Sequence, residues 1–292
     1  MENNKKFYGM SNDYMFRAVL QESEETLKHL VAALMKMDIA DIISCRVLNP
    51  IILGEQIDEK ETIMDVRLEL NDHTWINIEL QMWYRSNWPD RSLYYWARNF
   101  SNLKQGEGYE LTKPTYHIGI LDFPLVKDRP EFYAKYVIQN VRTGERYSDK
   151  LCIYVLDLTQ IEKAEKEGTD SPELIRWAKI FKAKTMKELE DLAGDEEALK
   201  RMVSMVKQLS EDEKMQQRLE AREDYERTIL TERNAGYRKG EEEGIKEGKI
   251  EGITETMLRV YQNCLDRGMS REEAIAISGI TEDVLAKVAK DG

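Results

Sequence analysis

The chain has 292 residues, of which 41% are hydrophobic and 34% are charged, and its formal net charge at pH 7 is −12. This length allows one large domain with an appendage, or two domains. The acidic balance excludes binding of nucleic acid through net charge alone, because neutralisation of phosphates by basic side chains supplies most non-specific affinity. Any contact with nucleic acid must be local, weak or bridged by a metal ion.

The cysteines and the apolar runs indicate the cellular compartment in which the protein resides. Cys45, Cys152 and Cys264 are widely spaced without a Cys-x-x-Cys pair, which fits neither a disulfide framework nor a zinc site and favours a reducing environment. The first residues hold no apolar signal segment, and no run approaches the ~18 apolar residues of a membrane span. We therefore expect a cytoplasmic protein with no membrane partner.

The N-terminal part predicts a helix followed by an edge strand. Residues 12–36 repeat apolar side chains at helical spacing, with Asn12 or Asp13 as the N-cap. Residues 46–54 are apolar but are broken by Pro50, which is typical of an edge strand or a loosely paired strand.

Residues 62–81, TIMDVRLELNDHTWINIELQ, hold two runs in which apolar and polar residues nearly alternate. The polar segment 71–73 separates them, so the pattern predicts a β-hairpin with one buried face and one wet face. Asp65 lies in the first run, and Glu79 and Gln81 lie in the second. Two carboxylates and an amide would then project toward one place.

Strand parity places a condition on this convergence. Side chains alternate along a strand, so Glu79 and Gln81 share one face. A two-residue turn would pair Asp65 with Leu80 and put the two carboxylates on opposite faces. The hairpin must therefore have a loop of odd length or a β-bulge.

The next segment predicts a helix and then three strands. Pro89 suits the first turn of the helix, and Gly106 and Gly108 are expected to end it. Its expected apolar stripe consists of Leu93, Trp96, Ala97, Phe100 and Leu103. The strands are predicted over residues 114–123, 131–142 and 151–158.

From Ser171 onward the sequence is helical in character. Ser171 can cap one helix, Asp195 can cap another that runs to about residue 209, and a charged helix follows over about 211–234. Near the C-terminus, Ser270 and Glu273 form the pattern of a capping box.

A glycine recurs every four residues in the C-terminal third, at Gly236, Gly240, Gly244, Gly248 and Gly252. Each helical glycine costs about 1 kcal/mol relative to alanine, so the segment is either flexible or packed against another helix. Four residues advance a helix by about 400°, so the glycines would form a spiral seam. We interpret the segment as a self-association helix or a hinge, with a solvated linker helix as the alternative.

Several short motifs, taken in order, resemble one family. They are DYMFR at 13–17, Lys60 followed by Asp65, INIELQ at 76–81, RSLYYW at 91–96, GEGY at 106–109 and LDF at 121–123. Their order and spacing resemble the recombination-promoting nuclease (Rpn) proteins, also described as PD-(D/E)xK nuclease family transposases. The resemblance covers roughly residues 10–160.

This resemblance implies an α/β fold with a PD-(D/E)xK (restriction-endonuclease-like) core, in which helices flank a mixed central β-sheet, and an α-helical C-terminal extension. We accordingly expect four regions. They are a nuclease-like domain over 1–165, a helical region over 166–235, a glycine-repeat helix or linker over 236–252, and a small helical segment over 253–292.

The resemblance also implies metal-dependent hydrolysis of DNA. Mg²⁺, for which Mn²⁺ can substitute, activates water and offsets phosphate charge in such reactions. Asp65 and Glu79 would be its carboxylate ligands, and the backbone carbonyl of Leu80 would be a third ligand. Gln81 stands where most of the superfamily has lysine, and it can orient a water molecule but carries no charge.

Several further residues have two interpretations each. Lys60 and Arg91 are candidates for a cation that contacts phosphate or DNA, and Arg91 is equally suited to a structural ion pair. Tyr95 is a candidate DNA contact, with a place in the core or groove wall as the alternative. Asp13 is an accessory candidate or a helix cap. His117, in a predicted buried strand, is interpreted as structural.

The implied function is a DNA endonuclease with little sequence preference, linked to recombination or mobile DNA. One alternative is a catalytically weak or inactive homologue that binds proteins through its acidic helical tail. Another is a nuclease that acts on phage or other foreign DNA. DNA is the expected partner, and self-association through the C-terminal helices is a second expected interaction.

Overall fold

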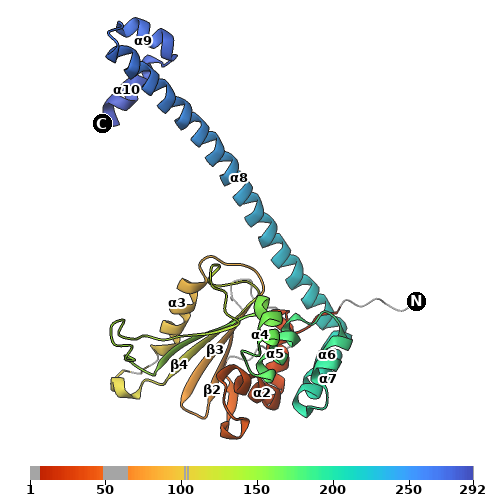
Figure 1. Cartoon of the computed structure of the whole chain (residues 1–292). Coiled ribbons are helices and arrows are strands. Elements are labelled where there is room, and N and C mark those ends of the chain that lie inside the picture. The colour runs from red at the N-terminus through yellow and green to blue at the C-terminus, as the bar shows by residue number, and fades with distance from the viewer. Residues whose placement is uncertain (1–6, 49–64, 102, 104, 292) are drawn as a thin grey trace, which may run out of the picture. The chain divides into compact units, whose positions relative to one another are not determined.

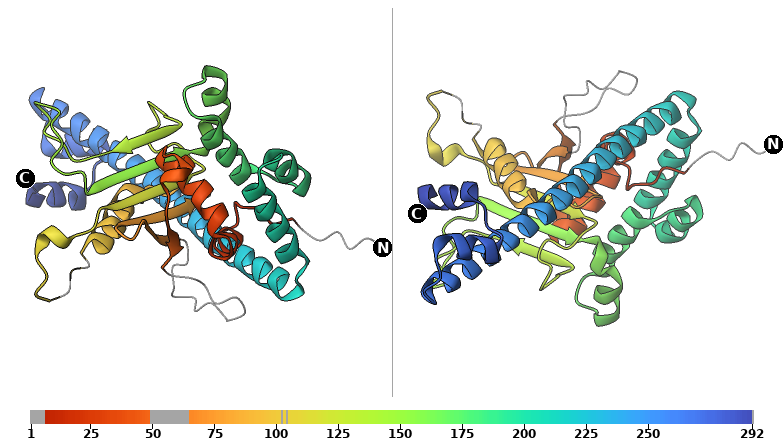
Figure 2. Two further views of the ribbon diagram at one scale, coloured as in Figure 1. Left: turned by 90° about the horizontal axis from the view of Figure 1, so that it is seen from below. Right: turned by 90° about the horizontal axis from the view of Figure 1, so that it is seen from above.

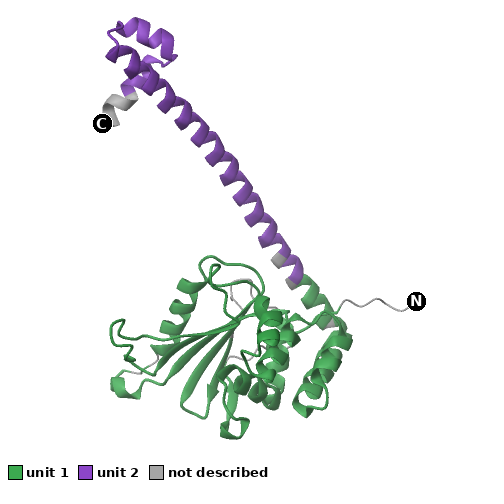
Figure 3. Cartoon of the chain, viewed as in Figure 1, with its two compact units in different colours: residues 1–221 green, residues 222–292 purple. Residues whose placement is uncertain are grey.

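The computed structural model describes residues 7–48, 65–101, 103 and 105–291 (Figure 1). The chain divides into two compact units, Met1–Ala221 and Arg222–Gly292 (Figure 3). Within the described part, no helix is both long enough and apolar enough to cross a membrane.

A mixed β-sheet forms the centre of the first unit. Its six described strands are β1 (Cys45–Val47), β2 (Asp65–Leu70), β3 (Thr74–Gln81), β4 (Thr115–Leu121), β5 (Tyr133–Tyr136) and β6 (Leu151–Asp157). Their order across the sheet is β1-β2-β3-β4-β6-β5. Strand β4 pairs in parallel with both β3 and β6, while the other pairs are antiparallel. The predicted mixed sheet is confirmed. Of the edge strand predicted over 46–54, Arg46 and Val47 lie in the edge strand β1, whereas residues 49–54 lie outside the described residues.

Most helices of the first unit share one large hydrophobic core with one face of the sheet. They are α1 (Asp13–Glu22), α2 (Glu24–Met35), α4 (Ile161–Glu167), α5 (Pro172–Lys182), α6 (Met186–Ala193) and α7 (Glu197–Glu211). Short 3-10 helices lie at η1 (Ile39–Asp41), η2 (Tyr109–Leu111) and η3 (Leu158–Gln160). The core includes residues on both sides of position 165, and the division predicted there stays a prediction.

The single helix predicted over 12–36 is in fact two helices. Ser23 lies between them in an extended conformation, with φ −128° and ψ 97°. Its hydroxyl accepts a hydrogen bond from the Thr26 amide at 3.2 Å and so caps α2. A serine at such a position offers the backbone an alternative to helical hydrogen bonds, and the apolar periodicity does not reveal this. The N-cap of α1 is Asn12.

Helix α3 (Trp88–Phe100) packs against the opposite face of the sheet, as Figures 1 and 2 show. The cluster beneath it is small and consists of Trp88, Leu121, Phe123, Ile153 and Val155. The predicted apolar stripe does not form the packed face of this helix, because Leu93 is 51% exposed whereas Ser92 and Asn99 are buried. The helix also ends at Phe100 with Ser101 as its C-cap, well before the glycines expected to end it.

The C-terminal region is helical, as predicted. Helix α8 (Glu213–Asp266) runs through the glycine repeat without a break, and α9 (Arg271–Ser278) and α10 (Glu282–Asp291) follow it. The capping box of Ser270 and Glu273 is confirmed. The predicted cap at Asp195 is wrong, since Glu196 occupies the N-cap position of α7.

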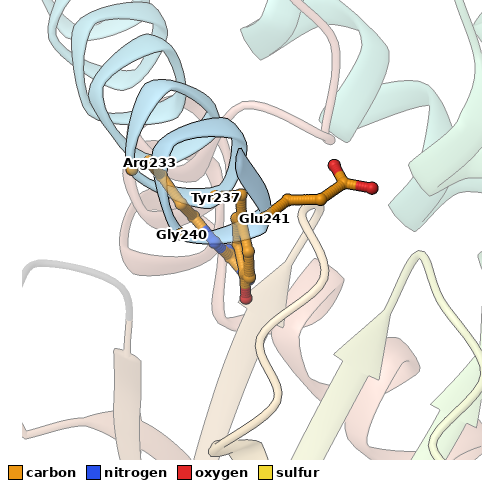
Figure 4. Close-up of a pocket in the computed structure, with 5 residues that line it drawn as sticks. Arg233, Tyr237, Gly240 and Glu241 are labelled. Carbon is orange, nitrogen blue, oxygen red and sulfur yellow. The ribbon is translucent and has the colours of Figure 1, made fainter. Parts of the chain in front are cut away.

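The glycines of α8 leave backbone uncovered within the second unit. No described atom beyond the helix's own backbone lies within 4 Å of a Cβ built at any of the five repeat glycines. A surface hollow follows from these missing side chains and is lined by Arg233, Gly236, Tyr237, Gly240 and Glu241 (Figure 4). The guanidinium of Arg233 lies 5.5 Å from the centre of the Tyr237 ring beside this hollow.

The three cysteines are all free and buried. Cys45 lies in β1, Cys152 in β6 and Cys264 in α8. Burial raises the pKa of the Cys45 thiol to about 12, and the charge of Glu24 adds to this effect.

Gly119 allows α3 to approach the sheet closely. A Cβ built at Gly119 would lie 2.2 Å from Cζ2 of Trp88, whose side chain is 1% exposed. We predict that Gly119→Ala lowers the free energy of unfolding by about 2 kcal/mol, because the indole must shift within a packed layer. Urea denaturation of the full chain measures this change.

Glu145→Ala is the control, since the Glu145 side chain is exposed in a turn. This variant should change the free energy of unfolding by no more than about 0.5 kcal/mol, as is usual for surface substitutions. Equal urea midpoints for Gly119→Ala and the wild type would contradict the proposed close approach.

Candidate functional site

The β2–β3 hairpin brings Asp65 and Glu79 into the same cross-strand pair. Leu70 pairs with Thr74, which leaves a three-residue loop at 71–73 and sets Asp65 directly opposite Glu79. Directly paired residues of an antiparallel hairpin project from the same face. The odd-length loop required by the sequence is therefore confirmed. The backbone of Asp65 is described, whereas its side chain lies outside the described part.

The loop obtains its shape from two residues with left-handed backbone conformations. Asn71 has φ 51° and Asp72 has φ 59°, values that asparagine and aspartate tolerate better than most residues. The Asn71 side chain accepts hydrogen bonds from the amides of Ile43 at 2.8 Å and Ser44 at 3.1 Å. These contacts tie the loop to the segment that precedes β1.

The polar face of β3 is covered rather than wet. Ile76, Ile78 and Leu80 belong to the large core, so the residues between them project toward the side of α3. Asn77, Glu79 and Gln81 are each at most 1% exposed. The predicted wet face is therefore wrong along this part of β3, because neighbouring side chains, Arg91 of α3 among them, cover it.

Arg91 of α3 pairs with Glu79. Its Nε donates a hydrogen bond to Glu79 Oε1 at 2.7 Å, and the two side chains are 14% and 0% exposed. The guanidinium also lies 4.7 Å from the centre of the half-buried Tyr95 ring. The structure thus shows the ion-pair alternative for Arg91, while DNA contacts by Arg91 and Tyr95 stay predictions.

His117 lies on the other side of Glu79. The parallel register pairs Asn77 with His117 and Glu79 with Gly119. His117 is fully buried, with its Nδ1 3.2 Å from Asn77 Nδ2 and its Nε2 3.4 Å from Glu79 Oε2. The predicted buried strand is confirmed, but the sequence pattern did not indicate the neighbours of His117. Pairing of β3 with β4 joins segments separated by a helix, and no local pattern fixes that register.

The environment of Glu79 favours its charged form. Burial alone raises the pKa of this carboxyl group, but the adjacent His117 and the positive charge of Arg91 act in the opposite direction. The pKa of Glu79 therefore lies below its usual value of 4.5. Glu79 is thus a charged carboxylate at a buried position.

Glu69 provides a contrast on the same face of β2. Its carboxylate contacts Lys113 and Arg46, each at 2.5 Å, and accepts a bond from Trp75 Nε1 at 3.3 Å. Hydrogen bonds from Lys113 and then Arg46 lower the pKa of Glu69 to about 2. Both of its oxygens have partners, so Glu69 has a structural role.

Several buried side-chain oxygens of β3 and β6 have no hydrogen-bond partner among the described residues. They include Glu79 Oε2, Gln81 Oε1 and Asp157 Oδ2. Gln81 and Asp157 occupy the same row of the sheet, on either side of Leu121. Burial raises the pKa of Asp157 despite its bonds from Thr159.

Oxygen donors of this kind suit Mg²⁺ or Mn²⁺ rather than softer metals. The backbone pairing of Asp65 with Glu79 and the buried, unpartnered Oε2 of Glu79 fit the predicted ligands, and a cation held by Asp65, Glu79 and the Leu80 carbonyl stays a prediction. Among the described side chains, which exclude that of Asp65, no three His, Cys, Asp or Glu residues gather as a metal site. The described hollows of about 540 and 480 Å³ on the first unit have linings that do not include Glu79.

Lys60 and Asp13 are two further residues that the sequence predicts as candidates. Lys60 lies outside the described residues. Asp13 begins α1, whose apolar residues belong to the large core, and its Oδ1 accepts a hydrogen bond from the Tyr14 amide at 2.8 Å. The structure supports the helix-end role of Asp13, although Asn12 is the N-cap.

Comparison with known proteins identifies one family. The family model described as PD-(D/E)XK nuclease family transposase matches residues 10–231, which include the whole sheet and helices α1 to α7. No curated protein and no solved structure matches the chain.

The ion pair between Arg91 and Glu79 leads to a prediction about stability. Arg91→Met should lower the free energy of unfolding at pH 7 by about 3 kcal/mol, because it leaves the buried Glu79 carboxylate without its guanidinium. Glu79→Gln added to Arg91→Met should restore part of this loss, because it removes the uncompensated charge. Urea denaturation of the single and double variants measures both effects, and a double variant no more stable than Arg91→Met would contradict the prediction.

The pH dependence provides a control for the same pair. Since the folded pKa of Glu79 lies below 4.5, its contribution is fully present above pH 4.5 and is lost as the pH falls through the folded pKa. The difference in stability between the wild type and Glu79→Gln should therefore shrink below pH 4.5.

Proposed function

The chain belongs to the PD-(D/E)XK nuclease family transposases, and from this premise we propose that it is a metal-dependent DNA endonuclease with little sequence preference. Family membership supports a nuclease related to mobile DNA, with DNA as the substrate. The observation that carries the finer proposal is the direct pairing of Asp65 with Glu79 beside Gln81. A link to recombination is part of the same proposal.

In this proposal Asp65, Glu79 and the Leu80 carbonyl hold Mg²⁺, and Mn²⁺ can replace it. When bound, such an ion lowers the pKa of a water molecule and offsets the charge of the phosphate. Glu79 is charged before any cation arrives, because its pKa lies below the usual value.

Gln81 contributes differently from the lysine found in most of the superfamily. Its buried Oε1 has no hydrogen-bond partner among the described residues, so it can accept a hydrogen bond from the attacking water and orient it. It adds no positive charge at the phosphate. We assign that role to Arg91 or to Lys60, with Tyr95 supporting the guanidinium of Arg91.

Nicking of supercoiled plasmid in Mg²⁺ or Mn²⁺ tests this assignment. Asp65→Asn and Glu79→Gln keep the side-chain shape but remove the charge, and each should reduce the rate by at least ~100-fold, the upper range for loss of an outer-shell partner. Glu145→Gln, in an exposed turn between β5 and β6, is the matched control and should nick at the wild-type rate.

Equal nicking rates in the wild type and the three variants would contradict the assignment of Asp65 and Glu79 as metal ligands. If the folded wild type does not nick, the alternative of an inactive homologue that binds other proteins gains support. A nuclease that acts on phage or other foreign DNA would use the same site, so nicking alone leaves that alternative open. A cytoplasmic location, where thiols stay reduced, suits the three free cysteines.

We further propose that α8 mediates self-association. The five repeat glycines expose a seam at which a second helix could approach closely, since no described atom fills the positions of the missing Cβ atoms. Light scattering of the full chain should give a mass above that of one copy, and Gly244→Leu should reduce it. A single-copy mass at micromolar concentration would contradict this proposal.

A further inference from the structure

Three buried side chains form a row from β3 to β4 and back to β3. Asn77 Nδ2 lies 3.2 Å from His117 Nδ1, and His117 Nε2 lies 3.4 Å from Glu79 Oε2. Each of the three residues is at most 1% exposed. The second contact is slightly too long or too bent for a hydrogen bond, and neither of its atoms has another partner among the described residues.

The first contact decides which nitrogen of His117 carries the proton. An amide nitrogen can only donate, so Asn77 Nδ2 requires a bare Nδ1 and leaves the proton on Nε2. A reversed Asn77 amide would place the proton on Nδ1. The bare Nε2 would then face the Glu79 carboxylate at 3.4 Å, with two lone pairs opposed in a buried site. Electrostatics therefore disfavours a bare Nε2 beside Glu79, and the orientation of the Asn77 amide in the structure gives the Nε2–H tautomer.

We propose that His117 is a positioning residue that holds the Glu79 carboxylate through its Nε2–H, and that Asn77 selects this tautomer. The proposal rests on the proposed function only in treating Glu79 as a cation ligand. A shift of a few tenths of an ångström closes the contact into a hydrogen bond.

This arrangement fixes the plane of the carboxylate. Arg91 holds Oε1 from α3, and His117 holds Oε2 from β4. Each carboxylate oxygen has two lone-pair directions, so one contact on each leaves another direction for a cation. Partners that orient a ligating group in this way usually change metal affinity by about 10- to 100-fold when removed.

Three substitutions separate positioning from packing. His117→Gln can place an amide N–H near the site of Nε2, His117→Asn is too short to reach Oε2, and His117→Leu fills space without a donor. The concentration of Mn²⁺ for half-maximal nicking should rise about 10-fold or more in the Asn and Leu variants. It should stay near the wild-type value in His117→Gln.

A similar shift in all three variants would overturn the positioning role, because packing alone would then explain it. Urea midpoints of the variants show whether each remains folded. If the wild type does not nick at all, the proposed function fails, and the tautomer measurement below still tests the contact.

The tautomer can be observed directly in the full-length wild type. The chain has three histidines, so long-range ¹H–¹⁵N spectra of protein with ¹⁵N-labelled histidine contain few signals. His117→Gln identifies the signals that belong to His117. We expect a proton on Nε2, which faces Glu79, and none on Nδ1, which faces the Nδ2 of Asn77. A proton on Nδ1, or protons on both nitrogens, would overturn the proposal.

Discussion

Glu79 carries a carboxylate at a point of the sheet where its exposed fraction is zero, and the rest of the site follows from that burial. A charge so far from solvent must be compensated by specific neighbours. Arg91 supplies the opposite charge from α3, and His117 supplies a polar contact from β4. Gly119, next to Glu79 in the parallel register, has no side chain and so leaves room for the helix that carries Arg91.

The same requirement explains the unusual composition of α3. A helix over an apolar sheet buries its apolar stripe, but here the sheet presents Asn77, Glu79, Gln81 and His117 beneath it. Helix α3 therefore turns Ser92 and Asn99 inward with Trp88, and it leaves Leu93 and Tyr94 largely exposed. The two faces of the sheet are thus specialised. One stabilises the fold through a large core, and the other holds buried polar groups beside a small apolar cluster.

Features set by neighbouring residues could be predicted from the sequence, whereas features set by packing could not. Alternation showed that Asp65 and Glu79 share a face only with an odd-length loop or a β-bulge, because this condition depends only on the hairpin itself, and the structure has a three-residue loop. The break at Ser23 was missed because a capping serine does not disturb the apolar periodicity. The covered state of Glu79 and its contact with His117 depend on α3 and on a parallel register, and neither is encoded in local alternation.

The rate at which the buried cysteines react with an alkylating reagent reports local unfolding of this chain. Only a thiolate reacts with alkylating reagents, and a buried thiol with a pKa of about 12, such as Cys45, is almost entirely protonated at neutral pH. Reaction therefore requires a transient opening that exposes the sulfur. The alkylation rates of Cys45 and Cys152 report opening at two different strands of the sheet, and the rate of Cys264 reports opening in the second unit. Local unfolding of the two units can thus be followed separately through the alkylation of their native cysteines.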